Sequence, residues 1–266
     1  MEMKYIDIHS HLDFESYGTD RDAVLERMKN AGVATITIGT GLESSKEAVK
    51  IAEANGNVWA CIGAHPDDNS GEVFDEKEYE KLVKSPKVVA IGECGLDYAE
   101  PRGLDADNRG IRKTEAEKSR QKAEFEKHIL FAIKYKKPLM LHIREAYDDT
   151  YEILKKYEGK VFGNLHFFTS NLKTAENFID LGFTISFPGI ITYVRDFDKV
   201  IKTILLDKIH AETDSPFATP IPHRGERNEP AYVVEVYKKI AEIRGEDPER
   251  VRLQLLENSG RVFDVS

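Results

Sequence analysis

Strand-like and helix-like segments alternate along almost the entire chain of 266 residues, and this rhythm is the strongest constraint on its fold. Short runs rich in apolar and β-branched residues predict eight strands. They lie near residues 4–8, 33–39, 57–63, 87–92, 138–142, 161–166, 183–187 and 207–212. Helices are predicted between and after them, at about 20–31, 44–55, 76–84, 115–136, 146–157, 172–181, 194–205, 230–244 and 248–258.

Strands that alternate with helices predict a parallel sheet, and eight strands are the number that closes a (β/α)8 TIM barrel. We expect an α/β protein with a single barrel domain over residues 1–266, since no linker or repeat divides the chain. A doubly wound open sheet is the alternative, but its Gly-rich phosphate-binding signature does not follow the first strand. Ser44-Ser45 before Glu47 resembles a helix capping box, and Asp247-Pro248 places a cap before a first-turn proline.

The acidic balance of the chain limits how it can meet nucleic acid. A formal net charge of −9 argues against non-specific coating of nucleic acid, because phosphate binding needs positive charge. It does not exclude a nuclease with a metal-loaded pocket. Cys61 and Cys94, both in predicted strands, are expected to be free thiols in a reducing compartment. No apolar run is long enough to span a membrane and no signal peptide pattern is visible, so we expect a cytoplasmic monomer or weak oligomer.

Two histidines close the first predicted strand. Side chains two residues apart on a strand point to the same face, so Asp7, His9 and His11 are expected to project together. Imidazole is the commonest metal-binding side chain. The pair can therefore begin a metal site, although two surface histidines would look the same without further ligands.

Active sites of barrels lie at the carboxyl ends of their strands. Seven ionisable side chains fall at such ends, in six of the predicted strands: His9, His11, His65, Glu93, His142, His166 and Asp214. So many acids and imidazoles are costly to bury together without a cation, which predicts a metal centre. His128, in a helical segment, and His210, inside the last strand, are expected to be structural.

Four histidines and two carboxylates are expected to be the metal ligands: His9, His11, Glu93, His142, His166 and Asp214. A catalytic zinc usually takes three protein ligands, so six suit two divalent ions, with Glu93 as the bridge. Zinc, manganese and magnesium are the candidates, and imidazole-rich ligation favours zinc, iron or manganese over magnesium. Two ions roughly 3.5–4 Å apart support hydrolysis at phosphorus or at a carbonyl.

Six stretches between residues 7 and 230 form a pattern in this order. They are Asp7-Ile8-His9-Ser10-His11-Leu12-Asp13, Gly63-Ala64-His65-Pro66, Ile91-Gly92-Glu93-Cys94-Gly95-Leu96-Asp97-Tyr98, Leu141-His142-Ile143-Arg144-Glu145-Ala146, Glu212-Thr213-Asp214-Ser215-Pro216, and Pro222-His223-Arg224-Gly225-Glu226-Arg227-Asn228-Glu229-Pro230. Together they resemble the TatD family of metal-dependent deoxyribonucleases, which belongs to the amidohydrolase-like barrels. The last stretch is the most distinctive.

The resemblance implies a ligand set and a reaction. His9, His11, Glu93 and Asp214 would hold one metal, and Glu93 would share the second with His142 and His166. The substrate would be DNA, single-stranded or at 3′ ends, cleaved at phosphodiester bonds and often exonucleolytically in the 3′–5′ direction. Asp214 would also be the general base for the attacking water, which makes Asp214 and Glu93 the expected catalytic residues.

The chain departs from the family pattern at three places. After the ligand His166 the family usually has a cysteine, a phenylalanine, a small residue and a glycine, whereas this chain has Phe167, Phe168, Thr169, Ser170 and Asn171. This change puts the pocket shape in doubt. Cys94 replaces a common threonine, and strand parity turns it away from Glu93. The polar segment 99–114 looks longer than usual and predicts a loop after the fourth strand. It is either a surface excursion or a flap that brings Arg102, Arg109, Arg112 or Lys113 to an anionic substrate.

Several other residues are candidates for contacts around the metals. Arg224 is expected to grip a substrate phosphate, although Arg224 and Arg227 could instead pair with Glu226 or Glu229. His65 exceeds the ligand count and is expected to contact substrate or a ligand. Asp97 and Arg144 could orient ligands, and Glu212 is expected to be a hydrogen-bonded acid inside the barrel. Trp59, Tyr98 and Tyr193 are expected to serve packing rather than base stacking.

Three functions remain open from the sequence. The first is a two-metal phosphodiesterase that acts on DNA, and the second is a hydrolase of a small-molecule ester or phosphoester on the same barrel. Many barrels of this group bridge their metals with a lysine on the fourth strand, so Glu93 favours the first. A non-enzymatic protein that has kept the barrel is the third, and the intact ligand set argues against it.

Overall fold

Eight parallel strands form the centre of the protein in a computed structural model, which describes residues 3–67, 73–99 and 113–265. They are β1 (Tyr5–Ser10), β2 (Val33–Ile38), β3 (Val58–Ile62), β4 (Val88–Asp97), β5 (Leu139–Arg144), β6 (Gly163–Leu165), β7 (Phe183–Phe187) and β8 (Ile209–Ala211). Each strand pairs with the next one in sequence. Two backbone bonds close the ring, because Asp214 N–H donates to His9 C=O (2.9 Å) and His11 N–H donates to Ser215 C=O (2.8 Å).

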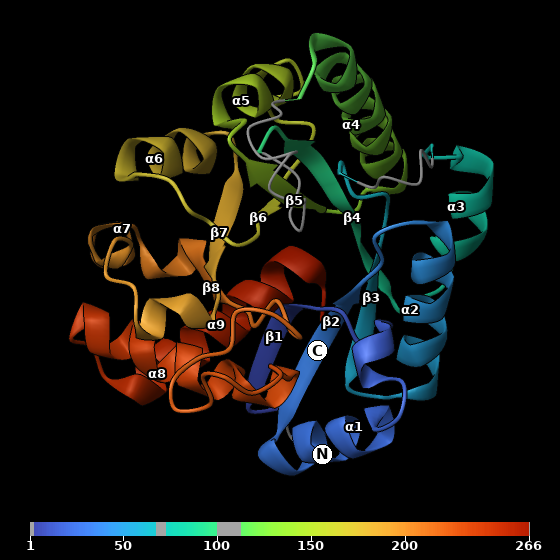
Figure 1. The fold of residues 1–266 in the computed structure, drawn as a ribbon. Coiled ribbons are helices and arrows are strands. Elements are labelled where there is room, and N and C mark those ends of the chain that lie inside the picture. Colours follow the sequence, from blue (N-terminus) through green and yellow to red (C-terminus); the bar gives the residue numbers. More distant parts are fainter. Residues whose placement is uncertain (1–2, 68–72, 100–112, 266) are drawn as a thin grey trace, which may run out of the picture.

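Helices surround this barrel on its outside (Figure 1). They are α1 (Arg21–Ala31), α2 (Leu42–Ala54), α3 (Glu76–Leu82), α4 (Glu115–Tyr135), α5 (Tyr147–Lys155), α6 (Leu172–Asp180), α7 (Asp198–Thr203), α8 (Val233–Arg244) and α9 (Pro248–Phe263), with short 3-10 turns η1 (Glu15–Tyr17), η3 (Gly189–Thr192), η4 (Leu206–Lys208) and η5 (Pro230–Tyr232). The predicted (β/α)8 TIM barrel in one domain is thus confirmed, and the doubly wound alternative is wrong.

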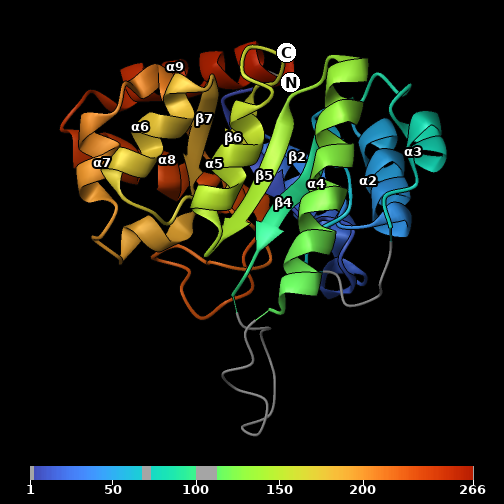
Figure 2. The same cartoon turned by 90° about the horizontal axis from the view of Figure 1, so that it is seen from above.

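The barrel has one functional rim. The carboxyl ends of the strands point to one side of the molecule, and both chain ends lie on the other side (Figure 2). Apolar side chains from the strands and the facing helices fill the layer between them, with Phe125, Phe178 and Ile240 among the fully buried ones. None of the helices in the described ranges is long and apolar enough to cross a membrane.

The inside of the barrel also holds polar side chains that bond to one another. Ser10 Oγ and Thr35 Oγ1 lie 2.8 Å apart. Asn164 donates to Ser186 Oγ (2.7 Å), and Ser186 donates to Oε2 of Glu212 (2.6 Å). Each of these groups is buried, so its desolvation is compensated by a partner. These bonds support the rim from below.

Two element boundaries differ from the sequence predictions. Helix α2 begins at Leu42 with Gly41 as its N-cap, so the capping box predicted at Ser44-Ser45 is wrong. Ser44 lies inside the first turn, where its hydroxyl donates to Asp13 Oδ2 (2.6 Å) and thereby ties two rim loops together. Strand β4 continues to Asp97, five residues beyond its predicted end. The Asp247 cap before Pro248 is confirmed, because its carboxylate accepts from Arg250 N–H.

Candidate metal centre

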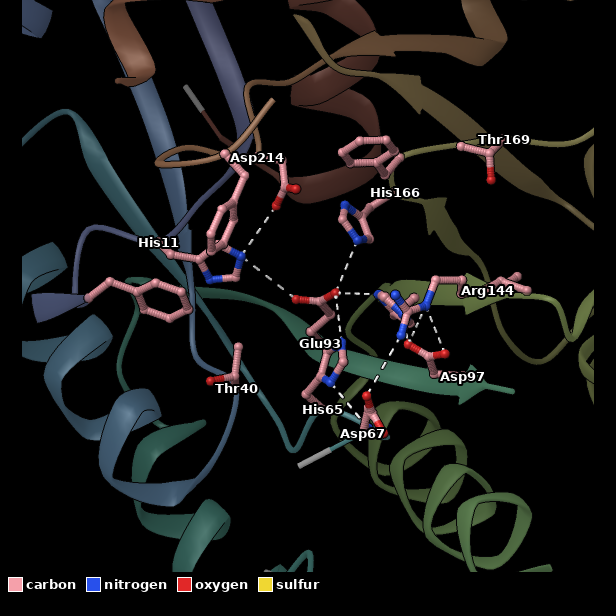
Figure 3. A pocket seen from close by; sticks show the side chains of 15 residues that line it. His11, Thr40, His65, Asp67, Glu93, Asp97, Arg144, His166, Thr169 and Asp214 are labelled. Atoms are coloured by element: carbon pink, nitrogen blue, oxygen red, sulfur yellow. Dashed lines mark hydrogen bonds and ion pairs between the residues drawn. The ribbon is translucent and has the colours of Figure 1, made fainter. Parts of the chain in front are cut away.

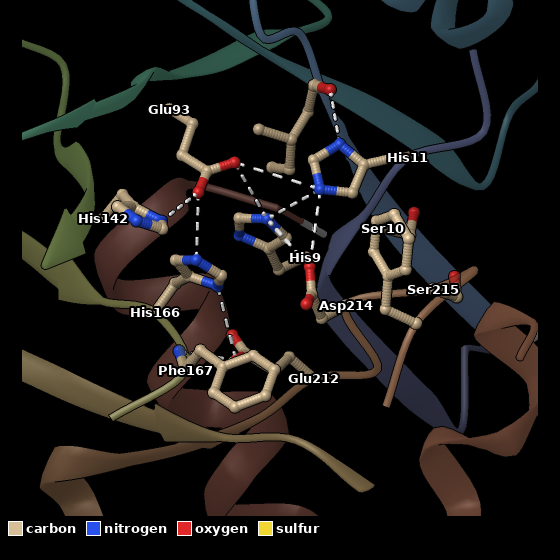
Figure 4. Close-up of polar contacts among 12 residues, drawn as sticks. His9, Ser10, His11, Glu93, His142, His166, Phe167, Glu212, Asp214 and Ser215 are labelled. Atoms are coloured by element: carbon tan, nitrogen blue, oxygen red, sulfur yellow. Dashed lines mark hydrogen bonds and ion pairs between the residues drawn. The ribbon is translucent and has the colours of Figure 1, made fainter. Parts of the chain in front are cut away.

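Six side chains from five strands and their following turns converge at the rim of the barrel (Figure 4). His9 lies in β1 and His11 directly follows it, while Glu93 and His142 lie within β4 and β5. His166 follows β6, and Asp214 comes three residues after β8. The six residues predicted as metal ligands are therefore brought together. Asp7, expected beside the histidines, instead accepts from Thr213 N–H (2.8 Å) and ties β1 to the chain after β8.

Glu93 reaches the centre because β4 is irregular at this point. Its pairing with β5 shifts between Ile91 and Cys94, so Gly92 and Glu93 leave the regular ladder. Gly92 has φ +151°, and a Cβ there would lie 2.4 Å from Met140 O. Only glycine fits so close to the neighbouring backbone. Cys94 is buried on the other side, with its Sγ near Ile91 and Met140 carbonyls, as strand parity predicts.

The two oxygens of Glu93 face two different groups of histidines. Oε2 lies 3.4 Å from Nε2 of His9 and 3.9 Å from Nε2 of His11. Oε1 lies 2.8 Å from Nδ1 of His142 and 3.0 Å from Nε2 of His166. A carboxylate placed in this way has one oxygen for each of two neighbouring cations. This is the geometry that a bridging ligand needs.

The first group joins His9, His11, Glu93 and Asp214. Nε2 of His9 and Nε2 of His11 face each other at 3.3 Å. Asp214 Oδ1 lies 3.4 Å from the His11 nitrogen and 3.7 Å from that of His9. With Nδ1 of His11 bonded to Ile38 O, the Nε2 lone pair of His11 converges with Nε2 of His9 and with the carboxylate oxygens of Glu93 and Asp214. A divalent cation between these atoms satisfies all of them, so the donor set fits a metal ion.

The outer nitrogens of His11 and His142 are held by acceptors. Nδ1 of His11 lies 3.1 Å from Ile38 O, and Nε2 of His142 lies 2.9 Å from Oδ2 of Asp97. Nδ1 of His166 lies 3.5 Å from Oε1 of Glu212. Such acceptors keep the proton on the outer nitrogen and leave the inner nitrogen's lone pair free for a metal. Nδ1 of His9 and Nδ1 of His166 are buried and have no hydrogen-bond partner among the described residues, so the contact of His166 with Glu212 is an ion-pair distance only.

The cluster keeps its carboxylates charged despite their burial. Burial alone would raise the pKa of Glu93, but His166, His65 and His9 outweigh it and hold that pKa well below its usual range. The pKa of Asp214 is lowered in the same way, against burial, by its hydrogen bond with His11 and by the charges of His166 and His9. Two ionised carboxylates are therefore ready for cations near neutral pH.

His65 follows β3 and reaches the same centre from above, with Nε2 3.6 Å from Glu93 Oε1. Its Nδ1 accepts a hydrogen bond from Asp67 N–H (3.1 Å). Burial lowers the pKa of His65 to about 3, so the ring is neutral and carries its single proton on Nε2. His65 thus presents a hydrogen-bond donor rather than a metal ligand in this arrangement.

A cavity of about 570 Å³ opens above these residues (Figure 3). Its lining includes five of the six predicted ligands together with His65, Asp97 and Arg144. His9 is fully buried beneath it. Arg144 donates to Asp97 Oδ1 (2.9 Å), and Asp97 in turn contacts His142, so both residues lie where they can orient that ligand.

The loop after β8 places its arginines away from the floor of this cavity. Arg224 is exposed and is not among the described residues that line it, and its guanidinium lies 4.2 Å from the ring centre of Tyr193. Arg227 pairs with Asp20 (2.7 Å) rather than with Glu226 or Glu229. Glu229 pairs instead with Arg27 on α1 (2.6 Å).

Two further histidines and one acid lie where the sequence predicts structural roles. His128, on α4, accepts from Ala64 N–H through Nε2 (3.0 Å) and donates from Nδ1 to Glu124 O (2.8 Å). His210 is fully buried in β8 beside Ser259. Glu212 accepts from Phe167 N–H (2.6 Å) and from Ser186, which matches the predicted hydrogen-bonded acid inside the barrel.

Sequence reasoning missed two residues at the cavity mouth, Phe14 and Phe217. Phe14 and Phe217 line the cavity, and each follows a predicted ligand by three residues. Lys113 contacts the carboxylate of Asp67, another lining residue, through its ammonium group. Most of the predicted loop 99–114, including Arg102, Arg109 and Arg112, lies outside the described residues. Thr114 begins α4 with a capping box.

Comparison with known proteins decides the family. The family model of TatD-related DNases matches residues 6–264. The chain belongs to the TatD family. An uncharacterized metal-dependent hydrolase from Buchnera aphidicola is 35% identical over 273 residues, covering 99% of this chain and 97% of that protein. YabD, an uncharacterized metal-dependent hydrolase from Bacillus subtilis, is 34% identical over 265 residues, covering 98% of this chain and 99% of its own.

A solved structure agrees with this TatD assignment. The crystal structure of YjjV, a TatD homologue from Escherichia coli, superposes with a TM-score of 0.87 at 28% identity, and the match covers 100% of both chains. The resemblance inferred from the six motifs is therefore confirmed. As a TatD-family barrel with this ligand cluster, the protein is a metal-dependent hydrolase.

Proposed function

We propose that this protein is a deoxyribonuclease that uses two divalent metal ions to hydrolyse phosphodiester bonds of DNA. The observation that carries the proposal is Glu93, whose two oxygens face the His9–His11 side and the His142–His166 side at 2.8–3.9 Å. His9, His11, Glu93 and Asp214 would hold one ion, and Glu93, His142 and His166 the other. Bound there, a pair of divalent ions supplies Lewis-acid activation of water and of the phosphoryl group.

The chain's own residues would complete the reaction. Asp214, ionised because its histidine neighbours lower its pKa, would accept the proton of the attacking water as general base. His65 would donate its Nε2 proton to a phosphoryl oxygen of the substrate, since its other nitrogen is already an acceptor for Asp67. Asp97 and Arg144 would hold the His142 ring in place.

The preferred substrate would be single-stranded DNA or a 3′ end, degraded from the 3′ terminus. The cavity of about 570 Å³ has the size of a small-molecule site, so it would admit an unpaired strand more readily than a duplex. Arg224, exposed above Tyr193, would contact a phosphate farther along the strand rather than the scissile one. Its guanidinium is free to do so, because none of the described acidic residues forms a salt bridge with it.

The test is hydrolysis of a single-stranded oligonucleotide labelled at its 5′ end. The protein is first stripped with a chelator and then supplied with zinc, manganese or magnesium. We expect a ladder of products shortened from the 3′ end, no hydrolysis before metal is added, and a loss of at least about 100-fold with Asp214→Asn. Hydrolysis that persists in the stripped protein, or an Asp214→Asn variant with wild-type rate, would contradict the proposal.

A hydrolase of small esters or phosphoesters is the second candidate. It is favoured because two cationic side chains at the cavity are not free to bind a DNA backbone. Arg144 is already paired with Asp97, and Lys113 is already paired with Asp67. The net charge of −9 also disfavours binding of a polyanionic DNA strand. A metal-loaded protein that hydrolyses small phosphodiesters but leaves every oligonucleotide intact would select this candidate.

A further inference from the structure

Two phenylalanines at the cavity mouth lie in the turns that follow proposed metal ligands. Phe14 N–H donates to His11 C=O (3.2 Å), and Phe217 N–H donates to Asp214 C=O (2.9 Å). Each ring is therefore carried on the turn that begins at a ligand. These bonds fix the backbone that carries each ring relative to a proposed ligand.

The two rings form one aromatic wall. The Phe14 ring stacks on the His11 imidazole, with ring centres 4.5 Å apart and planes at 22°. Phe217 meets Phe14 edge to face, at 6.1 Å and 74°. The Asn228 amide also donates to the Phe217 carbonyl, which fixes the backbone behind the ring. Phe217 nevertheless keeps 48% of its surface exposed, so a rigid aromatic surface is open toward the cavity.

A second cavity of about 580 Å³ adjoins this wall, because Phe14, Thr40 and Phe217 line both cavities. Its lining includes four carboxylates, those of Asp13, Glu15, Glu43 and Glu47. Lys46 and Arg21 pair with two of them from outside, but none of the described lining residues is a lysine or an arginine. A nucleic acid backbone that continued in this direction would find no counter-charge for its phosphates.

We propose that Phe217, supported by Phe14, is the stacking platform for the base of the 3′-terminal nucleotide, an inference that rests on the proposed function. Aromatic side chains stack with unpaired bases without regard to sequence. A terminal nucleoside brings a base and a free 3′ hydroxyl but no further phosphate. It therefore suits a place between an aromatic wall and a cavity lined by carboxylates, whereas a continuing strand does not. Phe217 is thus a specificity-determining residue for strand ends.

Binding of two small probes to the metal-loaded protein isolates the contribution of the base. Thymidine 5′-monophosphate and 2-deoxyribose 5-phosphate share the phosphate and the sugar, so the ratio of their Kd values reports the base alone. Stacking predicts that the nucleotide binds about tenfold more tightly to the wild type. Phe217→Ala should bring the ratio close to one, and Phe217→Trp should restore it. A ratio that Phe217→Ala leaves unchanged overturns the proposal.

Phe162→Ala is the matched control. Phe162 is 41% exposed, like Phe217, but it directly precedes β6 and so lies at the opposite rim of the barrel. This variant should keep the wild-type Kd ratio. A ratio lowered equally by Phe162→Ala and Phe217→Ala would mean that the loss is general, and the stacking assignment would be wrong.

The Phe217→Trp variant adds a spectroscopic readout. The natural chain has a single tryptophan, Trp59 in β3, so the variant's additional fluorescence comes from position 217. Stacking of a base on an indole quenches its fluorescence. Thymidine 5′-monophosphate should quench the added signal and 2-deoxyribose 5-phosphate should not. Equal responses to both probes would overturn the proposal.

Oligonucleotides with one abasic nucleotide place the base along the strand. An abasic 3′-terminal nucleotide should raise the KM of the wild type about tenfold, and Phe217→Ala should make KM insensitive to that change. Sensitivity confined to the penultimate base would contradict the terminal placement. A wild type that cleaves no DNA but keeps the Kd ratio would sink the proposed function and leave the stacking site. A wild type that cleaves DNA but has a Kd ratio near one would overturn the stacking site and leave the proposed function standing.

Discussion

Oδ2 of Asp97 lies 2.9 Å from Nε2 of His142, while Nδ1 of the same ring lies 2.8 Å from Oε1 of Glu93. Asp97 therefore fixes both the tautomer and the orientation of a proposed ligand. Asp97→Asn should weaken binding of the second ion by about 10- to 100-fold. The measurement is metal affinity by competition with a chromogenic chelator. Asp97→Glu should recover part of the affinity, and an unchanged affinity in Asp97→Asn would show that the contact does not position His142.

Glu212 lies beside His166, the other proposed ligand of the same ion. Its Oε1 accepts from Phe167 N–H (2.6 Å) and lies 3.5 Å from Nδ1 of His166. Glu212→Gln should lower the affinity for the second ion and leave that for the first nearly unchanged, because His9, His11 and Asp214 do not touch Glu212. Titration calorimetry with Mn²⁺ separates the two events. The control is Ser186→Ala, which removes the bond to Oε2 and the other bonds of the Ser186 hydroxyl but keeps the charge of Glu212. Equal losses in both variants would argue against a specific role for the charge.

Gly92 allows Glu93 to reach the centre. A Cβ at this position would meet Met140 O at 2.4 Å, and φ +151° disfavours any side chain. Gly92→Ala should displace Glu93 and abolish binding of both ions, with loss of thermal stability. Gly56→Ala is the control, because nothing lies within 4 Å of its Cβ position. Two ions bound to a folded Gly92→Ala variant, counted by elemental analysis, would refute this explanation of the β4 irregularity.

The stability of the metal-free protein should fall in mild acid. Burial lowers the pKa of His128 from 6.5 to about 4. In the unfolded chain His128 takes up a proton below about pH 6.5, whereas in the folded protein it stays neutral down to about pH 4. The free energy of unfolding is therefore unaffected by this group above about pH 6.5 and decreases as the pH falls from 6.5 to about 4. The contribution is about 1.4 kcal/mol per pH unit. The free energy of unfolding, measured by urea unfolding between pH 7 and 4, should fall less steeply with falling pH in His128→Gln than in the wild type. An equal pH dependence in both proteins would contradict this role of His128.

The alternation of segments predicted all eight strands and the barrel, because burial of strands and helices leaves a period in the sequence. The cluster of candidate ligands also followed from the sequence, since polar residues at strand ends meet at one rim. Two features left no such trace. The β4 irregularity at Gly92 depends on the neighbouring backbone of Met140, and α2 begins at Leu42 after Gly41, an N-cap that has no side chain to form a capping bond.

The cavity mouth was beyond sequence reasoning for a related reason. Phe14 and Phe217 are 203 positions apart and meet only because the turns after β1 and β8 are neighbours in the closed barrel. The position of Arg224 likewise could not be predicted. Its place in a motif led to the prediction of a phosphate contact, but its packing on Tyr193, which comes from a different loop, left no trace in the sequence.

Anomalous diffraction from a crystal soaked in Mn²⁺ shows whether two ions bind at this centre. We expect two peaks, one among His9, His11, Glu93 and Asp214 and the other among Glu93, His142 and His166, with the Glu93 carboxylate in contact with both. A well-ordered crystal with a single peak, or with two peaks that Glu93 does not join, would contradict this expectation.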